Sequence, residues 1–116
     1  GKVPFEIKEM RAKPDGFELV FTKPVDPISA ANPESWSMKS YTYLYQSSYG
    51  SDEIQKQDLE ITGAVVSDDG LNVRLTAKGL RELFVHELAA PAIRSSDGEP
   101  LLHSVGYYTL NRIPDR

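Results

Sequence analysis

A two-residue alternation of apolar and polar side chains constrains this chain more than any other feature of its sequence. In the cleanest run, residues 71–75, Leu, Val and Leu alternate with Asn and Arg, and a similar run spans residues 17–21. Successive side chains of a β-strand point to opposite faces, so this period predicts strands with one buried face. The residues that we expect in the core are Phe17, Leu19, Phe21, Trp36, Leu71, Val73 and Leu75.

Turn-forming residues separate the alternating runs at short intervals. Pro-Asp-Gly stands at 14–16, Ser-Asp-Asp-Gly at 67–70 and Ser-Asp-Gly-Glu-Pro at 96–100. In such clusters Pro presets φ, Asp bonds to nearby backbone and Gly accepts positive φ. About seven strands with this spacing predict an all-β fold, an immunoglobulin-like two-layer antiparallel β-sandwich. We expect one such domain to cover residues 1–116, because a core of this size holds together unaided.

Several segments depart from simple alternation. The phase slips near Glu9, which predicts a β-bulge, and a second slip predicts a kink near Ser40. A helical turn is expected after Asp26, and the polar segment 46–58 is interpreted as a long exposed loop. The apolar residues at 80–88 fit either an amphipathic helix or a strand. We favour a turn at 79–82 and a strand at 83–89, because the neighbouring segments are all β.

Charge and composition exclude several classes of function. The formal net charge is −4 and the pI is about 5.1, whereas proteins that bind the phosphate backbone concentrate Lys and Arg, so we expect no nucleic-acid partner. The chain has no cysteine, which removes disulfides and thiolate chemistry. No run approaches the roughly 20 apolar residues of a membrane helix, so we expect a soluble domain without membrane insertion. Gly1 resembles a residue left after tag removal and 112–116 resembles a linker, which predicts a domain excised from a longer multidomain protein.

Four segments together resemble a known family. They are Phe-Glu-Leu-Val-Phe-Thr-Lys-Pro-Val-Asp-Pro at 17–27, Asn-Pro-Glu-Ser-Trp-Ser-Met at 32–38, Ser-Asp-Asp-Gly-Leu-Asn-Val-Arg-Leu at 67–75 and Arg-Ser-Ser-Asp-Gly-Glu-Pro-Leu at 94–101. Across nearly the whole chain, these segments resemble bacterial immunoglobulin-like domains of the S-layer-protein type. The motifs consist of turn chemistry, so the resemblance implies a fold more strongly than a function.

A narrower resemblance rests on Val-His-Glu-Leu at 85–88 and Gly-Tyr-Tyr-Thr-Leu-Asn at 106–111. There the chain is similar to the Ig-like segment of large secreted proteins of planctomycete-type bacteria, whose neighbouring modules include sugar-dehydrogenase-like propellers, haem c domains and sugar-binding domains. The resemblance implies an extracytoplasmic location, periplasmic or secreted, and an accessory structural or interaction role. The implied partners are neighbouring domains of the same polypeptide or another protein.

Candidates for catalysis and metal binding are few. The two histidines, His86 and His103, lie outside any Gly-x-Ser-x-Gly elbow, and a lone histidine in a strand is more often structural. Two histidines without cysteine do not make a usual structural zinc site, and the Asp-Gly turns at 68–70 and 97–99 lack the spacing of a calcium loop. We therefore predict no catalytic residue, no metal and no cofactor, and we expect that the isolated domain is not an enzyme.

An aromatic strip is the strongest candidate for a binding surface. It comprises Trp36, Tyr41, Tyr43, Tyr45 and Tyr49. Alternation places Tyr41, Tyr43 and Tyr45 on one face of a strand. Three roles remain open for the strip: packing in the core, an interface with a neighbouring domain or protein, and a carbohydrate-binding surface on which sugar rings stack. The third role is the alternative to a purely structural function.

Overall fold

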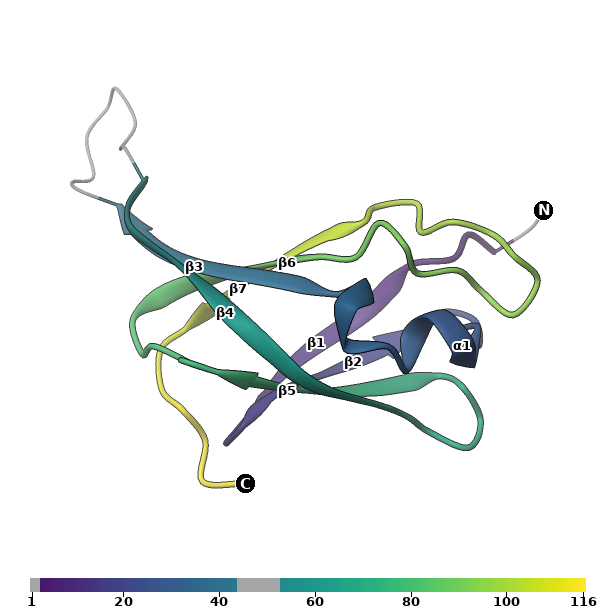
Figure 1. The fold of residues 1–116 in the computed structure, drawn as a ribbon, viewed down its shortest axis with the longest axis horizontal. Coiled ribbons are helices and arrows are strands. Elements are labelled where there is room, and N and C mark those ends of the chain that lie inside the picture. The colour runs from purple at the N-terminus through teal and green to yellow at the C-terminus, as the bar shows by residue number, and fades with distance from the viewer. Residues whose placement is uncertain (1–2, 44–52) are drawn as a thin grey trace.

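Seven antiparallel strands and two short helices form the part of the chain that the computed structural model describes, residues 3–43 and 53–116 (Figure 1). In chain order they are β1 (Ile7–Lys13), β2 (Gly16–Phe21), α1 (Pro27–Ala30), the 3₁₀ helix η1 (Pro33–Ser35), β3 (Ser37–Tyr43), β4 (Glu53–Val66), β5 (Asn72–Lys78), β6 (Phe84–Ala89) and β7 (Val105–Leu110). All seven strands belong to one sheet with the order β1-β2-β5-β4-β3-β6-β7. The predicted all-β antiparallel fold is confirmed.

Strand β4 joins the two layers of the sandwich. Its first half pairs with β3, with Leu59 opposite Met38, and its second half pairs with β5, with Val66 opposite Val73. The register shifts just before Gly63, where the strand passes from one layer to the other. One layer therefore holds β1, β2, β5 and the end of β4, and the other holds the start of β4, β3, β6 and β7. In Figure 1, β4 runs obliquely across the molecule between them.

Apolar side chains from both layers meet between them and form the core. Buried members of the main cluster include Phe5, Phe17, Leu19, Phe21, Val25, Trp36, Met38, Leu59, Val73, Leu75, Leu88 and Ile93. The core prediction is confirmed for all its residues except Leu71, which is only partly buried and precedes β5. The turn holds the backbone of Leu71, because its N–H donates to Asp69 and its carbonyl accepts from Phe21. Regular alternation therefore begins only at Val73.

Local irregularities occur where the sequence predicts them. The register of β1 against β2 shifts beside Glu9, and that of β3 against β4 shifts beside Ser40. Helix α1 begins after Asp26, whose carboxylate accepts the Ile28 N–H at 3.2 Å and so caps the helix. The bulge, the kink and the helical turn are thus confirmed.

The predicted loop at 46–58 is wrong from residue 53 onward, where β4 begins. Residues 44–52 lie outside the described part of the chain. The side chains at 55–58 are exposed, which accounts for their polar sequence, but the backbone there pairs with β3. Asp58 lies opposite Lys39, for example. Because residues 55–58 meet solvent on both faces, they lack the alternation that marks a half-buried strand.

The segment 80–88 is a strand preceded by a turn, as favoured from the sequence. Strand β6 covers Phe84–Ala89, and the connection from β5 occupies 79–83. Gly79 has a φ of 95° and Leu83 a φ of 71°, both in the left-handed region that interrupts a helix. Two backbone positions therefore decide between alternatives that hydrophobic spacing leaves open.

Candidate functional site

Trp36 and Tyr41 are the residues of the aromatic strip whose side-chain surroundings the structure describes, and both are buried. Trp36 is buried, its indole N–H donates to the Ala30 carbonyl at 3.0 Å, and its ring meets Phe21 edge to face. Tyr41 is only 1% exposed, and its hydroxyl donates to the Glu87 carboxylate at 3.2 Å. Neither ring presents a face on which a sugar can stack, so these two residues contribute to packing.

The hypothesis that the aromatic strip binds a partner now concerns its three remaining tyrosines. Tyr43 is the last residue of β3, and Tyr45 and Tyr49 lie outside the described residues. An interface or a carbohydrate surface on the strip therefore stays a prediction, and it concerns Tyr43, Tyr45 and Tyr49 rather than Trp36 and Tyr41.

His86 is fully buried on the inward face of β6, with its ring 5.7 Å from that of Phe17 between centroids. Its Nδ1 lies 3.1 Å from the Phe84 carbonyl oxygen, and its Nε2 accepts the Arg81 backbone N–H at 3.3 Å. A carbonyl oxygen only accepts, so we assign the ring proton to Nδ1 and leave Nε2 as the acceptor. Burial lowers the pKa of His86, the hydrogen bond to Phe84 opposes this, and the charge of Arg81 lowers it further. The ring is therefore neutral.

The Arg81 side chain ties the β5–β6 connection to β3 and β4. Its guanidinium donates to the Ser40 hydroxyl at 2.9 and 2.7 Å, to the Ser40 carbonyl at 3.0 Å and to the Gln55 carbonyl at 2.6 Å. The same group lies 3.8 Å above the centre of the Phe84 ring. Ser40 is completely buried, so Arg81 satisfies a polar side chain that would otherwise be isolated in the core. This cluster performs packing and hydrogen bonding rather than nucleophilic chemistry.

The Asp-Gly turn at 68–70 has a backbone explanation. Asp69 accepts hydrogen bonds from the Ser67 hydroxyl at 2.6 Å and the Leu71 N–H at 3.0 Å, and these bonds lower the pKa of its carboxyl. Across residues 3–43 and 53–116, no group of three or more His, Cys, Asp or Glu is placed to hold a metal ion. Within the same ranges no helix is long and apolar enough to cross a membrane.

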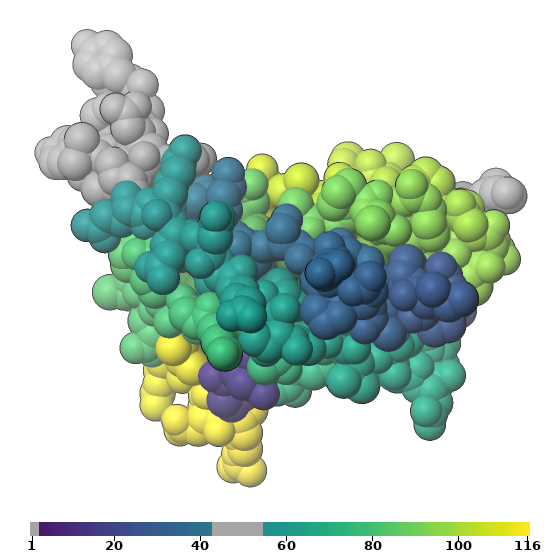
Figure 2. All heavy atoms as spheres, in the orientation of Figure 1, coloured from purple at the N-terminus to yellow at the C-terminus, as the bar shows by residue number. Residues whose placement is uncertain are grey.

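Exposed apolar side chains lie near both ends of the chain. Val3 and Leu102 are both exposed. The Leu102 N–H donates to the Phe5 carbonyl at 2.9 Å, which places Leu102 beside the N-terminal segment. Leu83 is 73% exposed, and its N–H donates to the Leu110 carbonyl at 2.5 Å at the end of β7. Figure 1 places the first described residues and the C-terminus on opposite sides of the domain, and Figure 2 shows the last residues projecting from its body.

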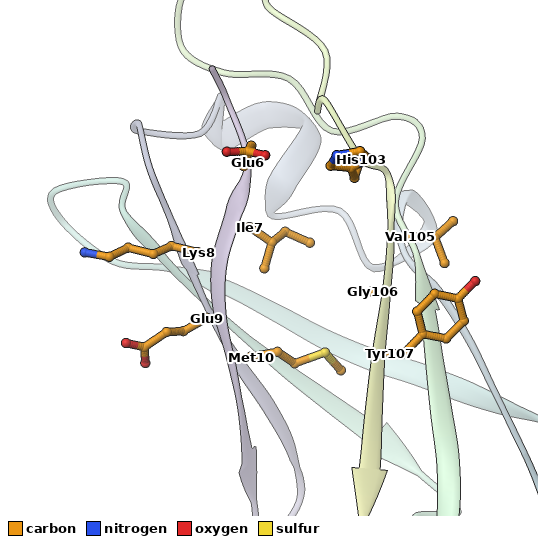
Figure 3. Close-up of a pocket in the computed structure, with 9 residues that line it drawn as sticks. All are labelled: Glu6, Ile7, Lys8, Glu9, Met10, His103, Val105, Gly106 and Tyr107. Atoms are coloured by element: carbon orange, nitrogen blue, oxygen red, sulfur yellow. The ribbon is translucent and has the colours of Figure 1, made fainter. Parts of the chain in front are cut away.

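A groove of about 210 Å³ separates β1 from β7, the two edge strands of the sheet (Figure 3). Ile7 and Met10 point from β1 toward β7, whereas Lys8 and Glu9 point away from it. A β-carbon at Gly106 would lie 3.8 Å from the Met10 sulfur, an ordinary van der Waals distance, so the Met10 side chain packs beside this position of β7. The groove is thus a seam of the sandwich that apolar side chains of β1 partly fill.

The fold and these sites define an antiparallel β-domain whose described polar clusters hold the structure together. Neither a family model nor a curated protein matches the chain. Among solved structures it is similar to the S-layer protein rSbsC(31-844), with a TM-score of 0.69 and 20% identity over 94% of this chain and 14% of that one. The N-terminal part of the bacterial S-layer protein SbsC gives 0.70 and 20%, over 94% of this chain and 24% of that one. This likeness shows the fold alone, and the chain spans a quarter or less of those proteins.

Sequence reasoning missed Arg81 and Leu83 as structurally important residues. A signal for Arg81 was present, since Ser40 lies two residues after the buried Met38 and His86 lies two residues before the buried Leu88, at inward positions of their strands. A polar residue at a core position requires a hydrogen-bond partner, so two of them predict a shared donor nearby. Leu83 carried no such signal, because its left-handed backbone follows from how the chain enters β6.

Proposed function

We propose that this chain is a non-catalytic structural module of a longer extracellular bacterial protein, and that it packs against neighbouring modules at its two ends. The observation that carries the proposal is the placement of exposed apolar residues beside the first described residues and the C-terminus, on opposite sides of the domain, with Val3 and Leu102 at one and Leu83 at the other. Exposed apolar surface tends to mark an interaction site. This arrangement suits modules that follow one another along a polypeptide.

The fold likeness adds support for this proposal. The chain corresponds to about one seventh to one quarter of the S-layer proteins it resembles, which accords with one module among several. The proposed surface or secreted location rests on the same likeness. The finer expectation of sugar-dehydrogenase or haem c neighbours rests on sequence resemblance alone.

Leu83 supplies an independent reason to expect an interface at the C-terminal end. A leucine with φ of 71° stores backbone strain, and its side chain is largely exposed, so little burial within the domain compensates. Strained residues of this kind cluster at sites where they contact something else. Packing of Leu83 against a following module would supply the missing burial.

The test compares the isolated chain with the chain linked to its flanking modules. Leu83→Ser should leave the isolated domain at least as stable, but it should lower the melting temperature of this domain in the linked protein and increase the interdomain flexibility seen by small-angle scattering. Val65→Ser is the matched control, since Val65 is similarly exposed on a strand away from the chain ends. Equal effects of the two substitutions in the linked protein would contradict the proposal.

A further inference from the structure

His86 has both ring nitrogens committed to backbone groups of one short segment. Nδ1 donates to the Phe84 carbonyl, and Nε2 accepts the Arg81 N–H. Protonation of Nε2 removes that acceptor, because an imidazolium only donates. The His86 ring is fully buried, so its new Nε2–H donor is left without a partner, and the partly buried Arg81 N–H loses its acceptor. The hydrogen bonds around His86 can therefore all form with the neutral ring but not with the protonated ring.

The side chains around His86 also disfavour a positive charge on its ring. The ring faces Phe17 from β2, and the register places it opposite Ser40 on β3 and Tyr108 on β7. Arg81 from the β5–β6 connection is the charged group that engages it, and it is a cation. Glu87, the next residue of β6, points to the opposite face of the strand. A proton on His86 therefore meets like charge as well as a dry environment.

The segment that His86 holds also contacts the C-terminal end of the chain. Besides Arg81, residues 79–83 include Glu82, whose carboxylate accepts the Ile113 N–H at 2.7 Å, and Leu83, whose N–H bonds to Leu110. Loss of the bond between the Arg81 N–H and His86 would therefore remove one of the contacts that hold this connection. The Arg81 guanidinium makes further contacts that hold it. The same connection carries the exposed Leu83 side chain.

We propose that His86 and Arg81 form a proton-sensitive clasp: acidification charges His86, releases residues 79–83, and loosens the C-terminal segment before the rest of the sheet unfolds. Because the native ring resists the proton, the clasp stays closed at neutral pH and opens only as the pH falls below the ordinary histidine value of about 6.5. The opening is a property of the domain by itself. Its effect on a neighbouring module rests on the proposed function.

Native-state hydrogen exchange on the isolated chain tests the clasp. Protection factors, which correct for the intrinsic effect of pH on exchange, are compared between about pH 7.5 and pH 4.5. The amides of Arg81 and Leu83 should lose protection about tenfold or more, whereas the Leu19 and Leu75 amides in the core should keep theirs. Loss of protection at all four amides together would show global unfolding and overturn the proposal.

Two substitutions separate His86 from other groups that titrate in this range. In His86→Gln the side-chain amide provides a hydrogen-bond acceptor and a donor but does not titrate. The pH-dependent loss of protection at the Arg81 amide should therefore disappear. His103→Gln removes the other histidine, which is exposed, and should leave the loss unchanged. A loss that persists in His86→Gln refutes the clasp while leaving the modular function standing.

A direct measurement keeps the proposal testable if His86→Gln does not fold. The ring signals of His86 in the unmodified chain are followed by NMR as the pH is lowered. The His86 ring should titrate below the ordinary histidine value of about 6.5, and the fall in Arg81 protection should follow the same curve. A His86 titration at or above that value, or one that is not accompanied by exchange at Arg81, would contradict the clasp.

Discussion

Replacement of Arg81 by alanine tests the energetic importance of the polar cluster. The guanidinium is the donor to both oxygens of the buried Ser40 and stacks on the Phe84 ring. The guanidinium also donates to the Gln55 carbonyl, which is exposed and can accept a hydrogen bond from water when the arginine is absent. Water cannot readily reach the buried Ser40, so Arg81→Ala leaves the Ser40 oxygens without the donor that they have in the native domain.

The expected cost follows from these contacts. A buried polar group left without a partner costs about 1–3 kcal/mol, and two Ser40 oxygens near the low end give about 2–3 kcal/mol. The lost cation–π contact adds about 0.5–1 kcal/mol at a partly exposed site. We therefore expect Arg81→Ala to lower the free energy of unfolding by about 3 kcal/mol, which corresponds to roughly 12 °C in melting temperature for a domain of this size.

Chemical denaturation near pH 7.5 measures the effect, with Arg11→Ala as the control. Arg11 forms ion pairs with Glu9 and Glu18, but its side chain is 53% exposed, so its removal should cost well under about 1 kcal/mol. Arg81→Lys should recover only part of the loss, since an ammonium lacks the planar fork. A cost for Arg81→Ala below about 1 kcal/mol, or equal to that of Arg11→Ala, would refute the reasoning.

Three further substitutions test local features of the fold. Gly16→Ala should destabilise the domain by about 1–3 kcal/mol in thermal melts, because a β-carbon there would overlap the Leu75 carbonyl oxygen, and a neutral result would contradict that close approach. Leu83→Gly should raise the free energy of unfolding by up to about 1 kcal/mol through relief of the positive φ, whereas a clear loss would mean that the leucine is not strained. Trp36→Phe should cost about 2 kcal/mol, since it deprives the buried Ala30 carbonyl of its donor; a change within about 0.5 kcal/mol of zero would show that this bond is dispensable.

Much of the strand pattern was available from the sequence, because its causes are local. The alternation at Phe17 and Leu19 reflects the two faces of one strand, and the Pro-Asp-Gly turn at 14–16 fixes the reversal before it. The cap at Asp26 and the slip near Glu9 likewise depend on a few adjacent residues. Such features persist whatever the rest of the chain does, so the all-β class could be predicted.

The candidate sites were predicted less well, because burial depends on distant segments. Alternation placed Tyr41 on a strand face, but only the packing decided that its ring is covered and that its hydroxyl meets Glu87. The start of β4 has a loop-like sequence, and pairing with β3 makes it a strand. No local pattern contains that information, since it resides in the partner strand.

What the sequence alone determined is where strands and turns occur and which residues avoid water. Tertiary structure alone decided that β4 serves both layers, that Arg81 reaches across to Ser40, and that Leu83 is left exposed in a left-handed conformation. The physical reason is range: propensity and alternation act over a few neighbouring residues, whereas these features depend on contacts between separate segments. Arg81 lies 26 residues from Gln55 and 41 residues from Ser40, for example. The energies of such contacts exist only once both layers have assembled.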